Sequence, residues 1–151
     1  MSDRVEIGLY RDQLVRWVDT IVGCMDGLSD DEVNWRPIPT GNSLAIVSSH
    51  LLGNLAQNVE ALGGPAYQRD RDAEFRAVVG VADLQARWQH LRSQIEQTLA
   101  ALPEGSLDRS FDHPQQGSKT GRDLIVVAMT HAAEHAGEAE LTRDLIKDRR
   151  G

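Results

Sequence analysis

The sequence predicts an all-α protein, an up-down four-helix bundle that forms a single domain over residues 1–151. Four segments repeat their apolar residues at spacings of three and four, which is typical of helices with one buried face. No segment alternates polar and apolar residues in the manner of a strand. A chain of 151 residues is also long enough to bury a core without disulfide bonds. We expect long loops between the second and third helices and between the third and fourth.

The first helix is expected to begin near Ser2 or Asp3 and to end at Gly27. Its apolar positions are Ile7, Tyr10, Leu14, Trp17, Val18, Ile21 and Met25. Residues 29–32, with the sequence Ser-Asp-Asp-Glu, match a capping box and predict one short helical turn as far as Trp35. Two prolines, Pro37 and Pro39, then end this turn.

The second helix is expected to begin at Asn42 or Ser43 and to end before Gly63-Gly64-Pro65. Its buried positions are Leu44, Val47, Leu51, Leu55 and Leu62. Residues 65–80 contain a mixed-charge stretch to which the pattern assigns no element. The third helix ends before Pro103, and its apolar positions are Leu84, Trp88, Leu91, Ile95, Leu99 and Leu102.

Residues 104–119 form a loop rich in Gly, Ser, Pro and Gln that has room for a short hairpin. The fourth helix is expected to begin at Thr120, with Asp123 at the capping-box position. It ends in the cationic residues 147–150, which suit a helix C-terminus. Its expected core positions are Leu124, Val127, Ala128, Leu141, Leu145 and Ile146.

Composition and charge argue against several classes of partner. Lys and Arg number 16 against 23 Asp and Glu, so the net charge is −7, which opposes non-specific binding to nucleic acid. No apolar run approaches the roughly 18 residues of a membrane span, so we expect no membrane partner. The N-terminus lacks the pattern of a signal peptide, and the single cysteine, Cys24, forms no internal disulfide. We therefore expect a cytoplasmic protein.

Three histidines are candidate metal ligands. At 100° per residue, His131, His135 and Glu138 all lie within about 40° of Leu124, on the expected core face of the fourth helix. Ionisable side chains that face a core must be paired or must bind a metal. The spacing of four residues lets two imidazoles converge on one ion. His50, midway along the second helix, can complete a three-histidine site, although a packed structural histidine is the other interpretation.

The remaining candidates have simpler interpretations. The segment His131-Ala-Ala-Glu134-His135 matches an inverted zinc-peptidase signature, so Glu134 is an acid/base, an outer carboxylate of the site or a surface residue. Glu138 is a candidate outer carboxylate for a ligating imidazole, or else an ion-pair partner of an arginine. We expect His90 on a solvated face, His113 in a turn, and Cys24 as a buried, inert thiol.

The ordered motifs resemble the DinB-like (DinB/YfiT) superfamily. The segments that carry this likeness are Gly27-Leu-Ser-Asp-Asp-Glu-Val-Asn-Trp-Arg-Pro37, Gly41-Asn-Ser-Leu44, His50 and His131-Ala-Ala-Glu-His-Ala-Gly-Glu138. The resemblance implies a four-helix bundle of the DinB/YfiT type that is commonly a homodimer. It also implies a divalent metal, zinc or nickel, held by three histidines that correspond to His50, His131 and His135. Characterised members of the superfamily include transferases that use low-molecular-weight thiols such as mycothiol or bacillithiol.

Three imidazoles leave an open position on a zinc-type ion, which is typical of a catalytic site. With the resemblance, this predicts a metal-dependent thiol S-transferase that acts on a small electrophilic molecule, with a low-molecular-weight thiol as a second cofactor. A metal-dependent hydrolase and a non-catalytic metal-binding or stress-related module remain alternatives. The candidate catalytic residues are Glu134 and Glu138, and the candidate cofactor-binding residues are Trp35 and Arg36.

Overall fold

A computed structural model describes residues 1–151, and the chain is mostly helical. Its elements are α1 (Asp3–Gly23), α2 (Asp30–Val33), α3 (Leu44–Ala61), α4 (Arg71–Glu74), α5 (Val81–Ala100), β1 (Ser110–His113), β2 (Gly117–Thr120) and α6 (Gly121–Arg149). The two strands form an antiparallel hairpin in the loop where the sequence had room for one. The helical class is therefore confirmed, and α1, α3 and α6 begin within two residues of their predicted starts.

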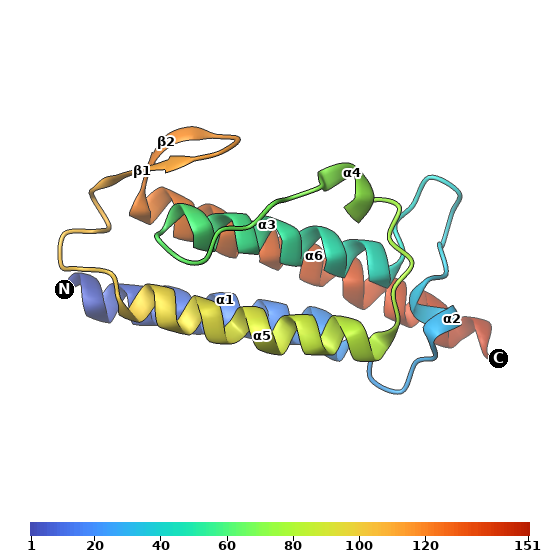
Figure 1. Cartoon of the computed structure of the whole chain (residues 1–151). Helices are drawn as coiled ribbons and strands as arrows, with labels where there is room; N and C mark the ends of the chain where they lie inside the picture. The colour runs from blue at the N-terminus through green and yellow to red at the C-terminus, as the bar shows by residue number, and fades with distance from the viewer.

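Four long helices, α1, α3, α5 and α6, pack around a common apolar core (Figure 1). Each of α1 and α3 contacts both α5 and α6. Helices α1 and α6 run in the same direction. Arg122 at the start of α6 pairs with Glu6 near the start of α1, and Arg143 near the end of α6 contacts Cys24 at the end of α1. These two pairs join the helices at both ends of the molecule.

Helices α3 and α5 also run in the same direction. Leu52 and Leu91 line one groove between them, and Val59 and Thr98 line another further along both helices. The strict up-down alternation expected from the sequence is therefore wrong at this connection. Residues 62–80 run back along the bundle to the end where α3 began, so α5 starts at that same end (Figure 1). The order of directions is up, down, down, up.

The helix starts follow the capping signals in the sequence, with one exception. Five caps accept a hydrogen bond from the backbone N–H three residues on: Ser2, Ser29, Ser43, Asp70 and Thr120. Helix α5 follows Gly80, which has no side chain to cap it. Instead Oδ1 of Asp30, in α2, accepts the N–H of Val81 at 2.9 Å. One carboxylate thus links the start of α5 to a segment fifty residues earlier.

The buried face of α6 differs from the predicted one. Val127, Leu141 and Leu145 are 51%, 63% and 40% exposed, so their assignment to the core is wrong. The buried positions are mostly small: Leu124, Ile125, Ala128, Ala132, Ala136, Ala139, Thr142 and Ile146. A face of alanines lets the neighbouring helices approach closely. The prediction from the sequence was wrong because it assigned the large apolar residues of α6 to the core in preference to the alanines. The true core face leaves the α6 histidines at its edge.

Candidate metal centre

His50, His131 and His135 come together between α3 and α6. Each offers one ring nitrogen, and these nitrogens all lie within 4.8 Å of one another. The ring centroids of His50 lie 5.2 Å from His131 and 5.3 Å from His135, and those of His131 and His135 lie 4.5 Å apart. One helical turn separates the two α6 histidines, and the packing of α3 against α6 brings His50 to face them. The predicted cluster thus forms at the seam between two helices.

Oxygen atoms hold the outer nitrogens of the two α6 histidines. Nδ1 of His135 lies 2.8 Å from Oε2 of Glu138, whose other oxygen accepts a hydrogen bond from Asn42. Nδ1 of His131 lies 3.3 Å from Oδ1 of Asn54. Because these oxygens accept hydrogen bonds, each neutral ring carries its proton on Nδ1 and a lone pair on Nε2.

These assignments leave two lone pairs facing each other. The Nε2 atoms of His131 and His135 are 2.9 Å apart. Two acceptors at this distance repel unless a proton or a cation lies between them. Neutral imidazole is also the form that binds metal ions. The donor set and its orientation therefore fit a divalent cation.

Burial keeps two of the three rings neutral. Burial first, and next the positive charge of a protonated His135, lower the pKa of His50 and of His131 to about 4. The hydrogen bond from His135 lowers the pKa of Glu138, so this carboxylate stays ionised as an acceptor. At neutral pH the cluster is thus set up as a group of ligands.

The surroundings of His50 come from the connection that the sequence pattern left unassigned. Nδ1 of His50 lies 3.4 Å from Oε1 of Glu74 and 3.4 Å from Nη2 of Arg69. The ring of Phe75 stacks on His50 with centroids 4.7 Å apart. The only local signal for this segment was Asp70, which caps α4 through the N–H of Ala73. A four-residue helix has no periodicity that would place its side chains.

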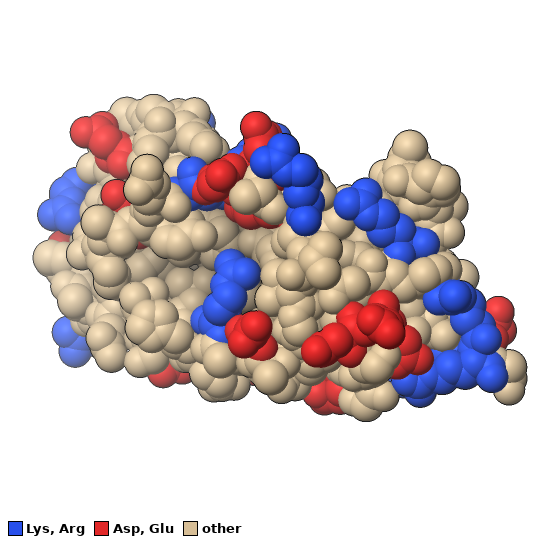
Figure 2. Space-filling view, turned by 45° about the vertical axis from the view of Figure 1, so that its right-hand side comes forward, with Lys and Arg blue, Asp and Glu red and all other residues tan.

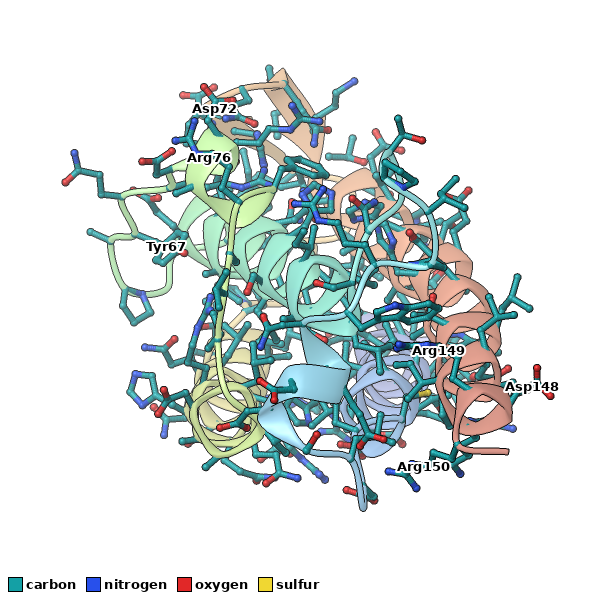
Figure 3. All side chains as sticks on the ribbon, turned by 90° about the vertical axis from the view of Figure 1, so that its right-hand side faces the viewer. Tyr67, Asp72, Arg76, Asp148, Arg149 and Arg150 are labelled. Atoms are coloured by element: carbon teal, nitrogen blue, oxygen red, sulfur yellow. The ribbon has the colours of Figure 1, made fainter.

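The two candidate cofactor-binding residues lie in different places. Arg36 donates to the carbonyl oxygen of Phe75 at 3.4 Å, so it lies beside the cluster. Trp35 instead lies under the guanidinium of Arg149, 4.3 Å from the ring centroid. Arg149 follows His135 by fourteen residues, or about 21 Å along a helix. In Figure 3 Arg149 lies well away from α4, which is marked by Asp72.

The other singled-out residues do not join the cluster. Glu134 is exposed on α6, as its surface interpretation predicted. His90 is exposed and contacts Gln94, while Nδ1 of His113 accepts two backbone N–H groups in the hairpin turn. Cys24 is buried, and burial raises the pKa of its thiol. The placements of Glu134, His90 and Cys24 agree with the expectations from the sequence, whereas His113 is the buried last residue of β1 and not a residue of the turn.

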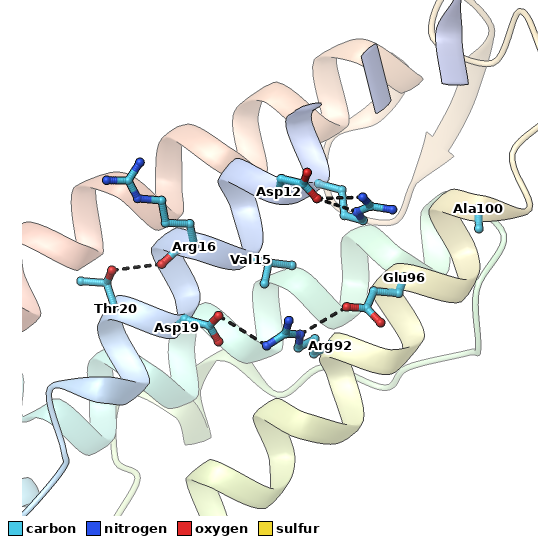
Figure 4. A pocket seen from close by; sticks show the side chains of 9 residues that line it. Asp12, Val15, Arg16, Asp19, Thr20, Arg92, Glu96 and Ala100 are labelled. Atoms are coloured by element: carbon cyan, nitrogen blue, oxygen red, sulfur yellow. Dashed lines mark hydrogen bonds and ion pairs between the residues drawn. The ribbon is translucent and has the colours of Figure 1, made fainter. Parts of the chain in front are cut away.

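A larger groove, of about 940 Å³, lies between α1 and α5 (Figure 4). Its central charges already satisfy one another, because Arg92 bridges Asp19 and Glu96. On the face shown in Figure 2, basic and acidic side chains are interspersed and form no continuous basic surface. None of the helices combines the length and the apolar character that crossing a membrane requires. The histidine cluster is therefore the stronger candidate site.

Comparison with known proteins shows the fold and the family of the chain. A solved structure described as a conserved protein from Enterococcus faecalis shares the fold, with a TM-score of 0.74 and 18% identity over 93% of this chain and 96% of that one. No protein with a curated description matches the chain. The family model of the DinB superfamily matches residues 13–139, which include all three histidines. The chain therefore belongs to the DinB superfamily.

Proposed function

We propose that the protein binds one divalent metal ion, zinc or nickel, through His50, His131 and His135. The observation that carries this proposal is the convergence of three ring nitrogens within 4.8 Å, on a chain of a superfamily in which we expect such a site. Imidazole is a suitable ligand for both metals, so the donor set alone does not choose between them. In this proposal the four long helices form the four-helix bundle of the family around the site.

The site has the composition of a catalytic rather than a structural metal centre. The cluster contains three protein ligands, and no fourth histidine, cysteine or carboxylate joins it. Glu138, Asn54 and Glu74 are further oxygen donors, but they lie against the outer nitrogens of His135, His131 and His50. Three protein ligands leave a position open for a substrate, whereas structural sites are closed by four. This supports an enzyme over a module in which the ion only joins two helices.

The activity that we propose is metal-dependent transfer of a low-molecular-weight thiol, of the mycothiol or bacillithiol type, to a small electrophile. A divalent cation held here supplies Lewis acidity that lowers the pKa of a coordinated thiol. The residues of the chain hold and orient the ligands through Glu138 and Asn54. Phe75 covers His50 and excludes water from that side. Arg36, bonded to the backbone of Phe75, is placed to attract an acidic thiol.

We further propose that the protein is a cytoplasmic homodimer. The exposed apolar residues Val127, Leu141 and Leu145 of α6 support a second copy as the partner. The single, buried cysteine supports a reducing compartment, because disulfides mark oxidising ones. Light scattering coupled to size-exclusion chromatography tests the dimer, and a monomer at micromolar concentration contradicts it.

Metal content is the first test of the proposed function. We expect about one zinc or nickel per chain in protein purified without a His-tag, and none in the double variant His131→Ala/His135→Ala. The variant His90→Ala is a matched control, since it removes an exposed histidine outside the cluster. A folded wild-type chain that takes up no metal even after reloading would disprove the metal site.

The second test concerns the reaction. Metal-loaded protein is incubated with a thiol and an electrophile such as a chlorinated dinitrobenzene, and the thioether product is measured. We expect product formation that requires both the metal and the thiol. Metal-dependent cleavage of ester or amide substrates without a thiol would instead show a hydrolase.

A further inference from the structure

A buried ion pair lies beside His50. The side chains of Arg69 and Glu74 are only 3% and 7% exposed. Nε of Arg69 lies 3.0 Å from both carboxylate oxygens, and Nη2 lies 2.7 Å from Oε1. Removing two charges from water is costly, and apolar residues of similar volume often stabilise a fold equally well. Stability alone is therefore a weak reason for this pair.

The pair offers His50 two different partners at one nitrogen. Oε1 of Glu74 and Nη2 of Arg69 each lie 3.4 Å from Nδ1. A carboxylate accepts and a guanidinium donates, so each contact belongs to a different tautomer of the ring. When Nδ1 carries the proton it donates to Glu74, and Nε2 has a free lone pair. When Nδ1 is bare it accepts from Arg69, and the proton on Nε2 prevents that nitrogen from ligating.

The same arrangement already exists at the other two histidines. Nδ1 of His131 faces Oδ1 of Asn54, and Nδ1 of His135 faces Oε2 of Glu138. Oxygen acceptors on the outer nitrogens of ligating histidines fix the ring tautomer and orientation. Glu74 brings an oxygen to 3.4 Å from Nδ1 of the third ring, an ion-pair distance, and the tautomer of the ring decides whether Nδ1 donates to this oxygen or accepts from Arg69. Its charge also balances Arg69, which would otherwise place an uncompensated cation next to a cation site.

Gly53 provides the space in which this carboxylate lies. It is a buried glycine on α3, three residues after His50, and a Cβ there would lie 2.8 Å from Cδ of Glu74 and closer still to Oε2. Glycine within a helix is less favourable than alanine by about 1 kcal/mol. The position therefore gives up helix stability to let the carboxylate of Glu74 pack against α3.

We propose that Glu74, held by Arg69 and accommodated by Gly53, is a positioning residue for His50. It accepts the Nδ1 proton and so fixes the tautomer in which Nε2 faces the cluster. This inference rests on the proposed metal site. It assigns a function to the connection between α3 and α5, which brings Arg69 and Glu74 back across the face of α3.

The substitution Gly53→Ala tests the inference from the backbone of α3. The added methyl group forces the carboxylate of Glu74 out of the position in which Arg69 holds it, while alanine favours the helix. We expect the affinity for Co²⁺ or Zn²⁺, measured by competition with a chromophoric chelator, to fall about 10- to 100-fold. Gly8→Ala is the matched control, because it is also a helical glycine but has no atom within 4 Å of the added group. Unchanged affinity in a folded Gly53→Ala protein would overturn the inference.

A second variant removes the pair itself. In Arg69→Met/Glu74→Leu both charges disappear together, so no unpaired charge remains buried. The double variant Arg122→Met/Glu6→Leu removes another Arg–Glu pair far from the cluster and is the control. Nitrogen-15 NMR of the imidazoles then reports the tautomer without any activity measurement. We expect Nδ1 of His50 to be protonated in the wild type and the two tautomers to mix in the variant that lacks Glu74.

These outcomes separate the inference from the proposal on which it depends. A wild-type chain that binds no metal refutes the proposed function, whatever the tautomer of His50. A wild-type chain that binds metal, together with a folded Arg69→Met/Glu74→Leu variant of equal affinity and unchanged tautomer, refutes the role of Glu74 alone. A purely structural role for the pair would change the thermal midpoint but not the affinity of the folded variant.

Discussion

Replacing Glu138 should weaken metal binding without unfolding the chain. Its carboxylate accepts from Nδ1 of His135 at 2.8 Å and is itself held by Asn42 at 3.3 Å. The substitution Glu138→Ala removes this acceptor and frees the ring of His135 to rotate and to change tautomer. The side chain is about a third exposed, so its loss leaves no cavity in the core.

The size of the effect follows from this single contact. A hydrogen bond to a charged group contributes about 1.5–3 kcal/mol, and partial exposure favours the lower half of that range. Loss of an outer partner of a ligating histidine typically reduces metal affinity 10- to 100-fold, which corresponds to about 1.4–2.7 kcal/mol. Both lines of reasoning therefore predict a loss of at least tenfold. Glu138→Gln keeps an acceptor but loses the charge, so we expect an intermediate effect.

The assay is a competition titration of metal-free protein with Zn²⁺, at fixed pH and ionic strength. Glu134→Ala is the control, because Glu134 is an exposed carboxylate one residue from His135 that contacts neither ring nitrogen. Any general effect of negative charge near the cation would appear in both variants. A loss of less than threefold in Glu138→Ala, or an equal loss in Glu134→Ala, would refute the positioning role of Glu138.

Three further predictions concern stability. Asp30→Ala removes the side chain that caps α5 and should lower the free energy of unfolding in urea by about 1 kcal/mol. The control Asp31→Ala, at the exposed neighbour, should change this free energy by less than about 0.5 kcal/mol, and equal effects of the two variants would contradict the cap. His50 and His131 have folded-state pKa values of about 4 against 6.5 in the unfolded chain, so in chelator the unfolded chain binds more protons between these values. Stability should therefore fall as the pH drops from about 6.5 to about 4, and a thermal midpoint that stays level over this range would exclude neutral buried rings. His113→Ala leaves two backbone N–H groups of the hairpin turn without their acceptor and should lower the free energy of unfolding by about 2 kcal/mol, measured by chemical denaturation; a negligible loss would contradict this role of the ring.

The α6 residues of the candidate site could be predicted from the sequence because their signals are local. His131 and His135 are separated by one helical turn, and any helix through them places both rings on one side. The capping oxygens of Ser29 and Thr120 were equally readable, since a cap acts on a backbone group three residues away. The role of His50 required the packing of α3 against α6, and the resemblance to a family supplied that information.

The parts that were missed depend on contacts between distant segments. Asp30 caps a helix that begins fifty residues later, and Arg69 and Glu74 meet His50 only because residues 62–80 fold back along α3. No periodicity exists in a connection of this kind, so its direction and its side-chain contacts are set by the tertiary fold. The shared direction of α3 and α5, where the sequence predicted opposite directions, has the same origin.

The error on α6 bears directly on function. The sequence predicted that the histidines lie in the middle of a core face that includes Val127. In the structure the core face of α6 consists mostly of alanines, and His131 and His135 lie half-buried at its edge. A metal in the centre of a packed core would be shielded from any substrate and would serve only to join helices. At the seam between α3 and α6, the side chain of His135 keeps 17% of its surface exposed, so the cluster meets solvent on this side. The edge position therefore supports the proposed catalytic site more strongly than the predicted core position would have done.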